Sequence, residues 1–310
     1  MKRSRTAGKP TGDDVSNSLF REIVRAINGN GLIRSAKNLR NEMMDQAFRL
    51  AGHAERDRFL AAFKADGRPV VFAVAFNTPW VVDLLTASWA ENVADSVLVV
   101  VDNSKSRAAR QVHREICRAR GVPYAELPKN REWHPNRSHA IAMNWIYYHL
   151  VDALKPEMFG FIDHDCFPIR PVSIAERLEG RSGYGLISHA TREPAIWYFW
   201  AGFGFFRYAI TSGRAVDFKH AYEWGADTGA RNWRPIFSTL QESYLREAKD
   251  EMVPAGDGAP VSRMQIIDER FNHIGKASYT ADLAKPEQRK ALADFLWGHY
   301  LPGKRPLVTP

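Results

Sequence analysis

Short apolar runs and helical stripes alternate along the middle of the chain. Residues 70–76 form an almost purely apolar run, which is typical of a strand buried on both faces of a parallel sheet. The segments between this run and the next ones place apolar residues three or four positions apart, as in amphipathic helices. The pattern predicts strands at 70–76, 96–101, 123–127 and 159–163, with helices at 78–92, 107–120 and 136–153. Such an alternation indicates right-handed βαβ units in a parallel sheet, with ligands at the carboxyl ends of the strands.

The alternation becomes less regular after Pro171. Apolar patterning predicts strands at 184–188 and 196–206, a helix at 237–249, and a last helix at 286–297. Pro286 suits the first turn of that helix, because the backbone N–H that proline lacks has no partner within the first turn of a helix. We expect these segments to complete the sheet.

The chain before residue 67 has a different pattern. Residues 1–14 carry Gly, Pro, Ser and charge without periodicity and predict a disordered basic tail. Residues 15–66 predict a helical N-terminal extension. Its two apolar stripes, separated by a Gly-Asn-Gly break at 29–31, are formed by Leu19, Ile23 and Ile27 and then by Ile33, Ala36, Leu39 and Met43.

Charge is concentrated at the N-terminus. The chain has 310 residues, of which 45% are hydrophobic and 25% charged, enough for a full core, and its net charge is +8. Residues 1–40 hold nine lysines and arginines against three acidic residues. A basic arm of this kind contacts nucleic acid, contacts anionic lipid or is simply solvated, and the solvated tail is the commonest case.

Cysteine content and hydropathy argue against a disulfide-rich, cysteine-based zinc-binding, membrane-spanning or secreted protein. Cys117 and Cys166 are the only cysteines, which supports neither a disulfide framework nor a cysteine-based zinc site. No stretch approaches the roughly 18 consecutive apolar residues of a membrane span, and the N-terminus lacks the apolar core of a secretion signal. We expect a cytoplasmic protein, with peripheral contact at the inner face of the membrane, through the basic helices, as the alternative.

The strongest candidate for chemistry follows the strand at 159–163. Asp163 and Asp165 flank His164 in a turn closed by Pro168, where an α/β sheet places its ligands. Two carboxylates this close repel each other unless a cation lies beside them, and such hard oxygen ligands suit Mg²⁺ or Mn²⁺ bridging a diphosphate. An Asp-x-Asp tripeptide alone is a weak signal, so its position at the strand end carries the inference.

The order of motifs along residues 68–210 resembles that of the GT-A-type glycosyltransferases, family-2-like members especially. The resemblance implies a GT-A-like, Rossmann-type mixed sheet flanked by helices, with a catalytic domain over 67–310. Residues 67–171 would form its nucleotide-binding half and 172–310 its acceptor-binding half. The motifs that carry the resemblance are Asn77-Thr78-Pro79, Val101-Asp102-Asn103-Ser104, Asn136-Arg137-Ser138-His139-Ala140 and Asp163-His164-Asp165.

The resemblance implies roles on the nucleotide side. Asn77 and Thr78 would line the nucleotide pocket, and Asp102 would approach the base or ribose; the alternative for Asp102 is an Asx turn that starts the next helix. A second group lies at the predicted start of a helix, where free N–H groups and a guanidinium would meet phosphate or sugar oxygens; the alternative is a helix cap with surface side chains. This second group consists of Asn136, Arg137 and His139.

The metal ligands follow from the same resemblance. Asp165 would bind the ion directly. Asp163 would either bind the ion, through water, or contact the ribose. His164 would point away from the ion. A third ligand in this family often comes from a distant histidine. His273, beside Gly275, is the first candidate and His299 the second, although a lone histidine is more often structural. The implied cofactor is Mn²⁺ or Mg²⁺.

The acceptor side is implied by three further residues. Trp200 and Gly202 would bind substrate, because aromatic faces stack on pyranose rings and a glycine leaves room for them. Asp227, in a Gly-flanked turn, is the candidate base for the acceptor hydroxyl, and capping a helix is its alternative role. A retaining enzyme would need no such base.

The function implied is transfer of a sugar from a nucleoside-diphosphate sugar to a glycan, lipid-linked or other hydroxyl acceptor, with no nucleic acid partner. Two alternatives stay open: a sugar-phosphate nucleotidyltransferase, and a non-catalytic GT-A-like protein that binds a glycan or a membrane. The sequence contains no dinucleotide fingerprint, P-loop, His-Glu-x-x-His or nucleophile elbow.

Overall fold

The computed structural model describes residues 31–255, 258–275, 277 and 285–310. The chain divides into two compact units, Met1–Ala47 and Phe48–Pro310. The expected disordered tail at 1–14 and the first apolar stripe of the extension lie outside the described residues. Helix α2 spans Gly31–Arg49 and contains the second stripe, and α3 follows at His53–Ala62. Within the described part of the chain, no helix is long and apolar enough to cross a bilayer.

Four parallel strands form the first half of the main sheet, in the order β3-β2-β1-β4. They alternate with crossover helices along the chain, so the predicted α/β sheet flanked by helices is confirmed. The strands are β1 (Val70–Ala75), β2 (Val97–Asp102), β3 (Tyr124–Glu126) and β4 (Met158–Asp163), and the helices are α4 (Pro79–Asn92), α5 (Arg107–Arg120) and α6 (Pro135–Ile146). The predicted helix over 136–153 continues past α6 through a π-helical turn (Tyr147–Val151) into α7 (Asp152–Leu154).

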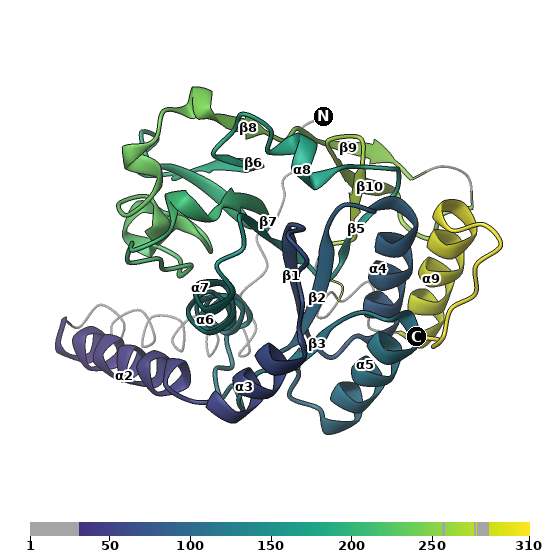
Figure 1. Ribbon diagram of the computed structural model, residues 1–310, viewed down its shortest axis with the longest axis horizontal. Helices are drawn as coiled ribbons and strands as arrows, with labels where there is room; N and C mark the ends of the chain where they lie inside the picture. The colour runs from purple at the N-terminus through teal and green to yellow at the C-terminus, as the bar shows by residue number, and fades with distance from the viewer. Residues whose placement is uncertain (1–30, 256–257, 276, 278–284) are drawn as a thin grey trace, which may run out of the picture. The chain divides into compact units, whose positions relative to one another are not determined.

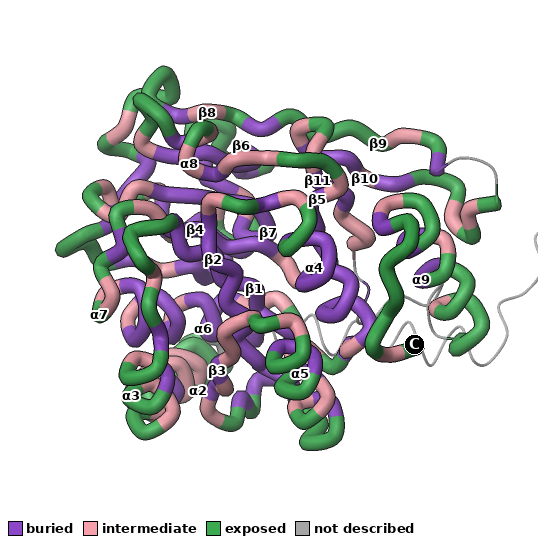
Figure 2. Tube along the Cα trace, turned by 45° about the vertical axis from the view of Figure 1, so that its right-hand side comes forward, coloured by how far each residue is buried: buried purple, intermediate pink, exposed green. Residues whose placement is uncertain are grey.

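Both faces of this sheet are buried, which explains why β1 is apolar throughout and β2 and β4 are apolar up to their terminal aspartates. Phe72 and Val74 of β1 belong to the core on the α6 side, while Val71 and Ala73 belong to the core on the α4 side. Helices α4 and α5 lie on one side of the strands and α6 on the other (Figure 1). The strands are buried along most of their length, whereas the outer sides of α5 and α9 are exposed (Figure 2).

Three further strands complete the sheet as a mixed one. Strand β7 (Trp197–Arg207) runs antiparallel to β4, β6 (Gly183–His189) runs antiparallel to β7, and β8 (Leu245–Glu247) pairs parallel with β6. The two predicted strands at 184–188 and 196–206 are therefore confirmed. The predicted helix at 237–249 is wrong. Its residues form the 3₁₀ turns Phe237–Thr239 and Glu242–Tyr244 and then β8.

Local and tertiary contacts explain why that helix does not form. The hydroxyls of Ser238 and Thr239 bond to nearby backbone carbonyls, which competes with a helical ladder. Phe237 packs between the rings of Trp197 and Phe199, with centroids 5.2 and 5.3 Å away. Leu245 then pairs with Gly183 at the edge of the sheet, and this pairing outweighs a weak helical preference.

A second sheet of four short strands was not expected from the sequence. Its order is β5-β11-β10-β9, and all pairs are antiparallel. The strands are β5 (Cys166–Pro168), β9 (Asp250–Pro254), β10 (Arg263–Ile267) and β11 (Phe271–His273). Helix α9 (Pro286–Tyr300) matches the predicted last helix, and α8 (Ile174–Arg177) is one short turn. Single 3₁₀ turns occur at Tyr208–Ile210, Tyr222–Trp224 and Ala230–Asn232.

Candidate metal centre and active site

Two aspartates and a histidine meet where β4 ends. Asp163 is the last residue of β4, Asp165 lies just before β5, and His273 is the last residue of β11. Strand β11 pairs with β5 so that His273 lies opposite Cys166. The Nε2 atom of His273 is 3.4 Å from Oδ1 of Asp165 and 3.9 Å from Oδ2 of Asp163. One ligand atom from each residue lies within 4.8 Å of the others, a spacing that a single ion can span.

The ring of His273 is oriented by its second nitrogen. Nδ1 lies 2.6 Å from Oε1 of Gln265 on β10, and an amide oxygen only accepts hydrogen bonds. In the neutral ring Nδ1 therefore carries the proton, and the lone pair of Nε2 faces the two aspartates. The ring also contacts Trp200, with centroids 5.0 Å apart. Metal-binding histidines are commonly fixed in this way.

The two charged partners shift each other's ionisation. Burial disfavours the charged form of His273, but the hydrogen bond and negative charge of Asp165 outweigh burial and raise the pKa of the ring. Burial alone would raise the pKa of Asp165 as well, yet the hydrogen bond and charge of His273 hold it below its usual value. The cluster thus favours an ionised carboxylate, which is the form that binds a cation.

The two carboxylates are held differently. Oδ2 of Asp165 accepts a hydrogen bond of 3.1 Å from the Ala277 N–H, which leaves Oδ1 toward His273. Oδ1 of Asp163 is buried without a hydrogen-bond partner among the described residues, and Nδ1 of His139 lies 3.5 Å from it. A buried carboxylate oxygen without a donor is costly unless a cation compensates it. The donor set therefore fits a divalent ion, which Asp163, Asp165 and His273 would hold.

Gly202 allows β7 to approach this cluster closely. A Cβ built on Gly202 would lie 2.5 Å from Oδ2 of Asp163 and 2.4 Å from the Trp200 ring. No side chain fits there. The glycine therefore lies against the carboxylate, next to the indole of Trp200.

Residues from both halves of the chain line one cavity of about 880 Å³ around the cluster. This volume is in the range of small-molecule sites. Of the residues selected from the sequence, the cavity is lined by Asn136, His139, Asp163, Asp165, Trp200, Gly202, Asp227 and His273. The start of α6, the end of β4, the middle of β7 and the second sheet thus converge on one site.

Asp227 lies on the loop that faces the start of α6. Its Oδ1 accepts hydrogen bonds from the Thr228 N–H at 2.7 Å and from Nδ2 of Asn136 at 3.1 Å. Its own N–H donates to the Tyr198 hydroxyl at 2.8 Å. The residue is exposed, and no described residue donates to its Oδ2. Asp227 therefore presents one anchored and one open oxygen to the cavity.

Arg137 does not line this cavity. Its Nε donates to Oε2 of the buried Glu132 at 2.9 Å, while Oε1 of Glu132 accepts from the Trp133 and His134 N–H groups. Burial would raise the pKa of Glu132, but Arg137 and these N–H groups lower it. The arginine thus fixes the loop before α6.

The nucleotide-side residues at the ends of β1 and β2 do not line the cavity either. Asn77 has a left-handed φ of 52°, and its N–H donates to Oγ of Ser104 at 2.8 Å, which ties the two strand ends together. The hydroxyl of Thr78 donates to the Phe76 carbonyl and lies 2.9 Å from Nε2 of His164. Asn77 and Thr78 line a separate cavity of about 570 Å³ near the C-terminus. Asp102 is fully buried.

His299, the second candidate for the third ligand, lies on α9. Its ring stacks on Phe295 at 5.5 Å and contacts Tyr300 at 4.6 Å. Within the described residues it is not part of the Asp163–Asp165–His273 cluster.

Sequence reasoning missed Gln265 and a row of aromatic rings. Successive ring centroids along Trp133, His134, His220 and Tyr222 are 5.7, 6.4 and 3.8 Å apart. The two outer rings are exposed, Trp133 by 75% and Tyr222 by 59%. The inner ring His134 lines the cavity, so the row passes the cavity and both of its ends are exposed. The neighbouring Trp133 and His134 in the sequence could have indicated the aromatic row. No sequence pattern indicated Gln265.

Comparison with protein-family models and with curated proteins finds no match. Similar solved structures include the apo form of WbbM, a bifunctional glycosyltransferase, at 14% identity and a TM-score of 0.38 over 62% of this chain and 39% of that one. The mannosyltransferase PcManGT from Pyrobaculum calidifontis, in complex with GDP-Man and Mn²⁺, matches at 14% identity and a TM-score of 0.34. The match covers 58% of this chain and 59% of that one.

The galactosyltransferase LgtC, in complex with donor and acceptor sugar analogues, matches at 13% identity and a TM-score of 0.37 over 58% of this chain and 73% of that one. The chain thus spans less than two thirds of WbbM and of PcManGT. These matches are to glycosyltransferases, the class that the sequence motifs resemble. Because their TM-scores are below 0.5, we base the proposal below on the geometry of the site.

Proposed function

We propose that the protein is a metal-dependent glycosyltransferase that moves a hexosyl unit from a nucleoside-diphosphate sugar to a hydroxyl acceptor. The observation that supports it best is the Asp163–Asp165–His273 cluster, which shares one cavity with the open carboxylate of Asp227. In a metal-dependent inverting transfer, an ion stabilises the leaving diphosphate and a base takes the proton of the acceptor hydroxyl.

The metal side would hold the donor. Asp165 and His273 would bind Mn²⁺ or Mg²⁺ directly, and Asp163 would bind it or contact the ribose. A bound ion neutralises the negative charge that develops on a departing diphosphate. The mixed carboxylate and imidazole set favours Mn²⁺, because Mg²⁺ prefers oxygen ligands. His139 at the start of α6 would face the sugar or phosphate oxygens.

The base side would activate the acceptor. Oδ2 of Asp227 would take the proton of the acceptor hydroxyl as that oxygen bonds to the anomeric carbon, while the bond from this carbon to the diphosphate breaks. Asn136 and the Thr228 N–H hold Oδ1 and so fix the direction of Oδ2.

The acceptor would be a saccharide. The exposed rings of Trp133 and Tyr222 are the two ends of a row whose inner ring His134 lines the cavity, and aromatic faces stack on the apolar faces of pyranose rings. Trp133→Ala would then raise the KM for the acceptor and leave donor binding unchanged.

The test is calorimetric titration of the full chain with UDP- and GDP-sugars, with and without Mn²⁺. We expect one donor to bind only with Mn²⁺, and Asp165→Asn to abolish this binding. Asp294→Asn is the matched control, since Asp294 is exposed and its only ion pair among the described residues is with Lys290. Binding to no donor, or binding unchanged in Asp165→Asn, would overturn the proposal.

A further inference from the structure

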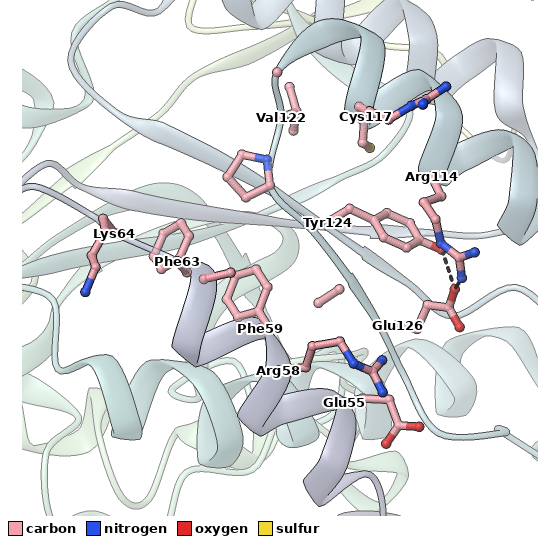
Figure 3. A pocket seen from close by; sticks show the side chains of 15 residues that line it. Glu55, Arg58, Phe59, Phe63, Lys64, Arg114, Cys117, Val122, Tyr124 and Glu126 are labelled. Atoms are coloured by element: carbon pink, nitrogen blue, oxygen red, sulfur yellow. Dashed lines mark hydrogen bonds and ion pairs between the residues drawn. The ribbon is translucent and has the colours of Figure 1, made fainter.

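A second cavity, of about 990 Å³, lies between α3 and the edge strand β3. Figure 3 shows the rings of Phe59 and Phe63 on one side of it and Val122 and Tyr124 on the other. The two phenylalanine rings stack on each other with centroids 5.0 Å apart. It shares no lining residue with the cavity around Asp163 and Asp165. It is therefore a separate site at the far edge of the parallel strands.

The rim of this cavity carries unneutralised positive charge. Its basic side chains are Arg58, Lys64, Arg114 and Arg118, and its acidic ones are Glu55 and Glu126. Arg114 forms an ion pair with Glu126, seen as the dashed line in Figure 3. Among the described residues, none forms an ion pair with the other three cations. The cavity thus combines apolar walls with a net positive rim.

The positive surface continues past Arg114. That residue and Glu126 also line a neighbouring cavity of about 1020 Å³. Its remaining basic residues are Lys105, Arg107, Arg110, Lys129 and Arg131. Only Arg110 among these five has an acidic partner in the described chain, Glu126 at 3.6 Å. Such a run of cations attracts anions, and guanidinium groups bind phosphate in a bidentate manner.

We propose that the cavity between α3 and β3 binds one molecule of an anionic, phosphate-bearing lipid. The acyl chain would lie against Phe59, Val122 and Tyr124, where apolar surface is removed from water. The phosphate would lie among Arg58, Arg114 and Arg118, at the border with the basic cavity. A free phosphate ion would leave the apolar walls unused, and an uncharged lipid would leave the rim cations without a partner.

The site gives the protein a route to an anionic membrane surface. A single buried chain gives only marginal, reversible membrane binding, and adjacent basic residues strengthen it. The inference stands independently of the proposed glycosyl transfer, since the two cavities have no residue in common.

The test uses dihexanoyl phosphatidic acid, which is soluble as a monomer, in calorimetric titration against the full chain. Glycerol phosphate tests the head group alone, and dihexanoyl phosphatidylcholine tests the chains with a zwitterionic head. We expect saturable binding of phosphatidic acid, at least ~10-fold tighter than of either relative, because each lacks one of the two contributions.

Two variants locate the binding. Ala62→Trp fills the cavity from its exposed edge, and Arg118→Glu reverses an exposed rim charge. The matched controls Ala291→Trp and Arg305→Glu change exposed residues of the C-terminal region. We expect each cavity variant to weaken phosphatidic acid binding at least ~10-fold, and each control to leave it unchanged. Equal binding of glycerol phosphate, or lipid binding that survives both cavity variants, would overturn the proposal.

Discussion

Two aspartates at the carboxyl ends of parallel strands have opposite environments. Asp102 ends β2 with no exposed surface, and its carboxylate accepts from the Ser104 N–H at 2.7 Å and the Tyr124 hydroxyl at 2.9 Å, with Nδ1 of His113 also at 2.9 Å. Asp163 ends β4 on the wall of a cavity, with a buried oxygen that no described residue bonds. A carboxylate at a strand end can bind a ligand only when its oxygen lone pairs are not already used by hydrogen bonds within the protein.

The difference comes from the elements that cover each strand end. Helix α5 and strand β3 supply His113 and Tyr124, which close the surroundings of Asp102. Within the described residues no comparable donor covers Asp163, beside which Gly202 of β7 has no side chain of its own. We therefore propose a structural role for Asp102 and a metal-ligand role for Asp163.

The largest expected effect is on stability, at Asp102. Asp102→Ala removes the carboxylate that contacts the buried His113 and the partly buried Tyr124 hydroxyl, and it should lower the free energy of unfolding by about 3–5 kcal/mol. Urea denaturation followed by circular dichroism measures the change. Asp57→Ala, at an exposed ion pair, is the control and should change little. If the two variants are equally stable, the closed cluster has no structural role.

The next effect concerns catalysis, at Asp227. Asp227→Asn keeps the contact with Thr228 but removes the base, so kcat should fall by ~10²–10⁴ with the Kd for the donor unchanged. Single-turnover transfer and donor titration separate the two quantities. A weaker donor Kd at unchanged kcat would place Asp227 in donor binding instead.

A smaller effect is expected at Gln265, whose Oε1 contacts the metal ligand His273 while its Nε2 donates to Oδ2 of Asp250 at 2.6 Å. Gln265→Leu removes the acceptor for Nδ1 of His273 and should weaken Mn²⁺ binding by about 10–100-fold. The conservative Gln265→Glu should retain most of the affinity. Mn²⁺ binding unaffected by either change would mean that His273 needs no orientation.

The smallest effect is on pH dependence. Burial would raise the pKa of Asp102, but the hydrogen bond and charge of His113 and the bonds from Ser104 lower it. Its contribution to stability is therefore present above the unfolded pKa of about 3.9 and is lost as the pH falls through the lower folded value. Unfolding free energies should decline more steeply below about pH 4 in the wild type than in Asp102→Asn. Parallel curves would contradict this.

The sequence predicted the parallel half of the fold because three of its four strands, β1, β2 and β4, are mainly short, continuous apolar runs. It also selected Asp163, Asp165, Asn136 and Asp227, which the structure brings to one cavity. Their roles in donor and acceptor binding stay predictions.

The rest depends on contacts between distant segments. The strands of the second sheet are three to five residues long and partly polar, too short for a periodic signal. In the sequence His273 and His299 look alike, because each has a nearby glycine. The pairing of β11 with β5, which brings His273 next to Asp165, is visible only in the structure. The closure of Asp102 likewise needed His113 and Tyr124, whose approach no local pattern predicts.

The metal centre can be tested by electron paramagnetic resonance of free Mn²⁺ titrated with the full chain in the presence of UDP or GDP. Wild-type protein should remove one Mn²⁺ per chain from solution, and Asp165→Asn and His273→Ala should remove none, while His299→Ala should behave as wild type. Equal Mn²⁺ uptake by the wild type, Asp165→Asn and His273→Ala would contradict a metal site at these residues.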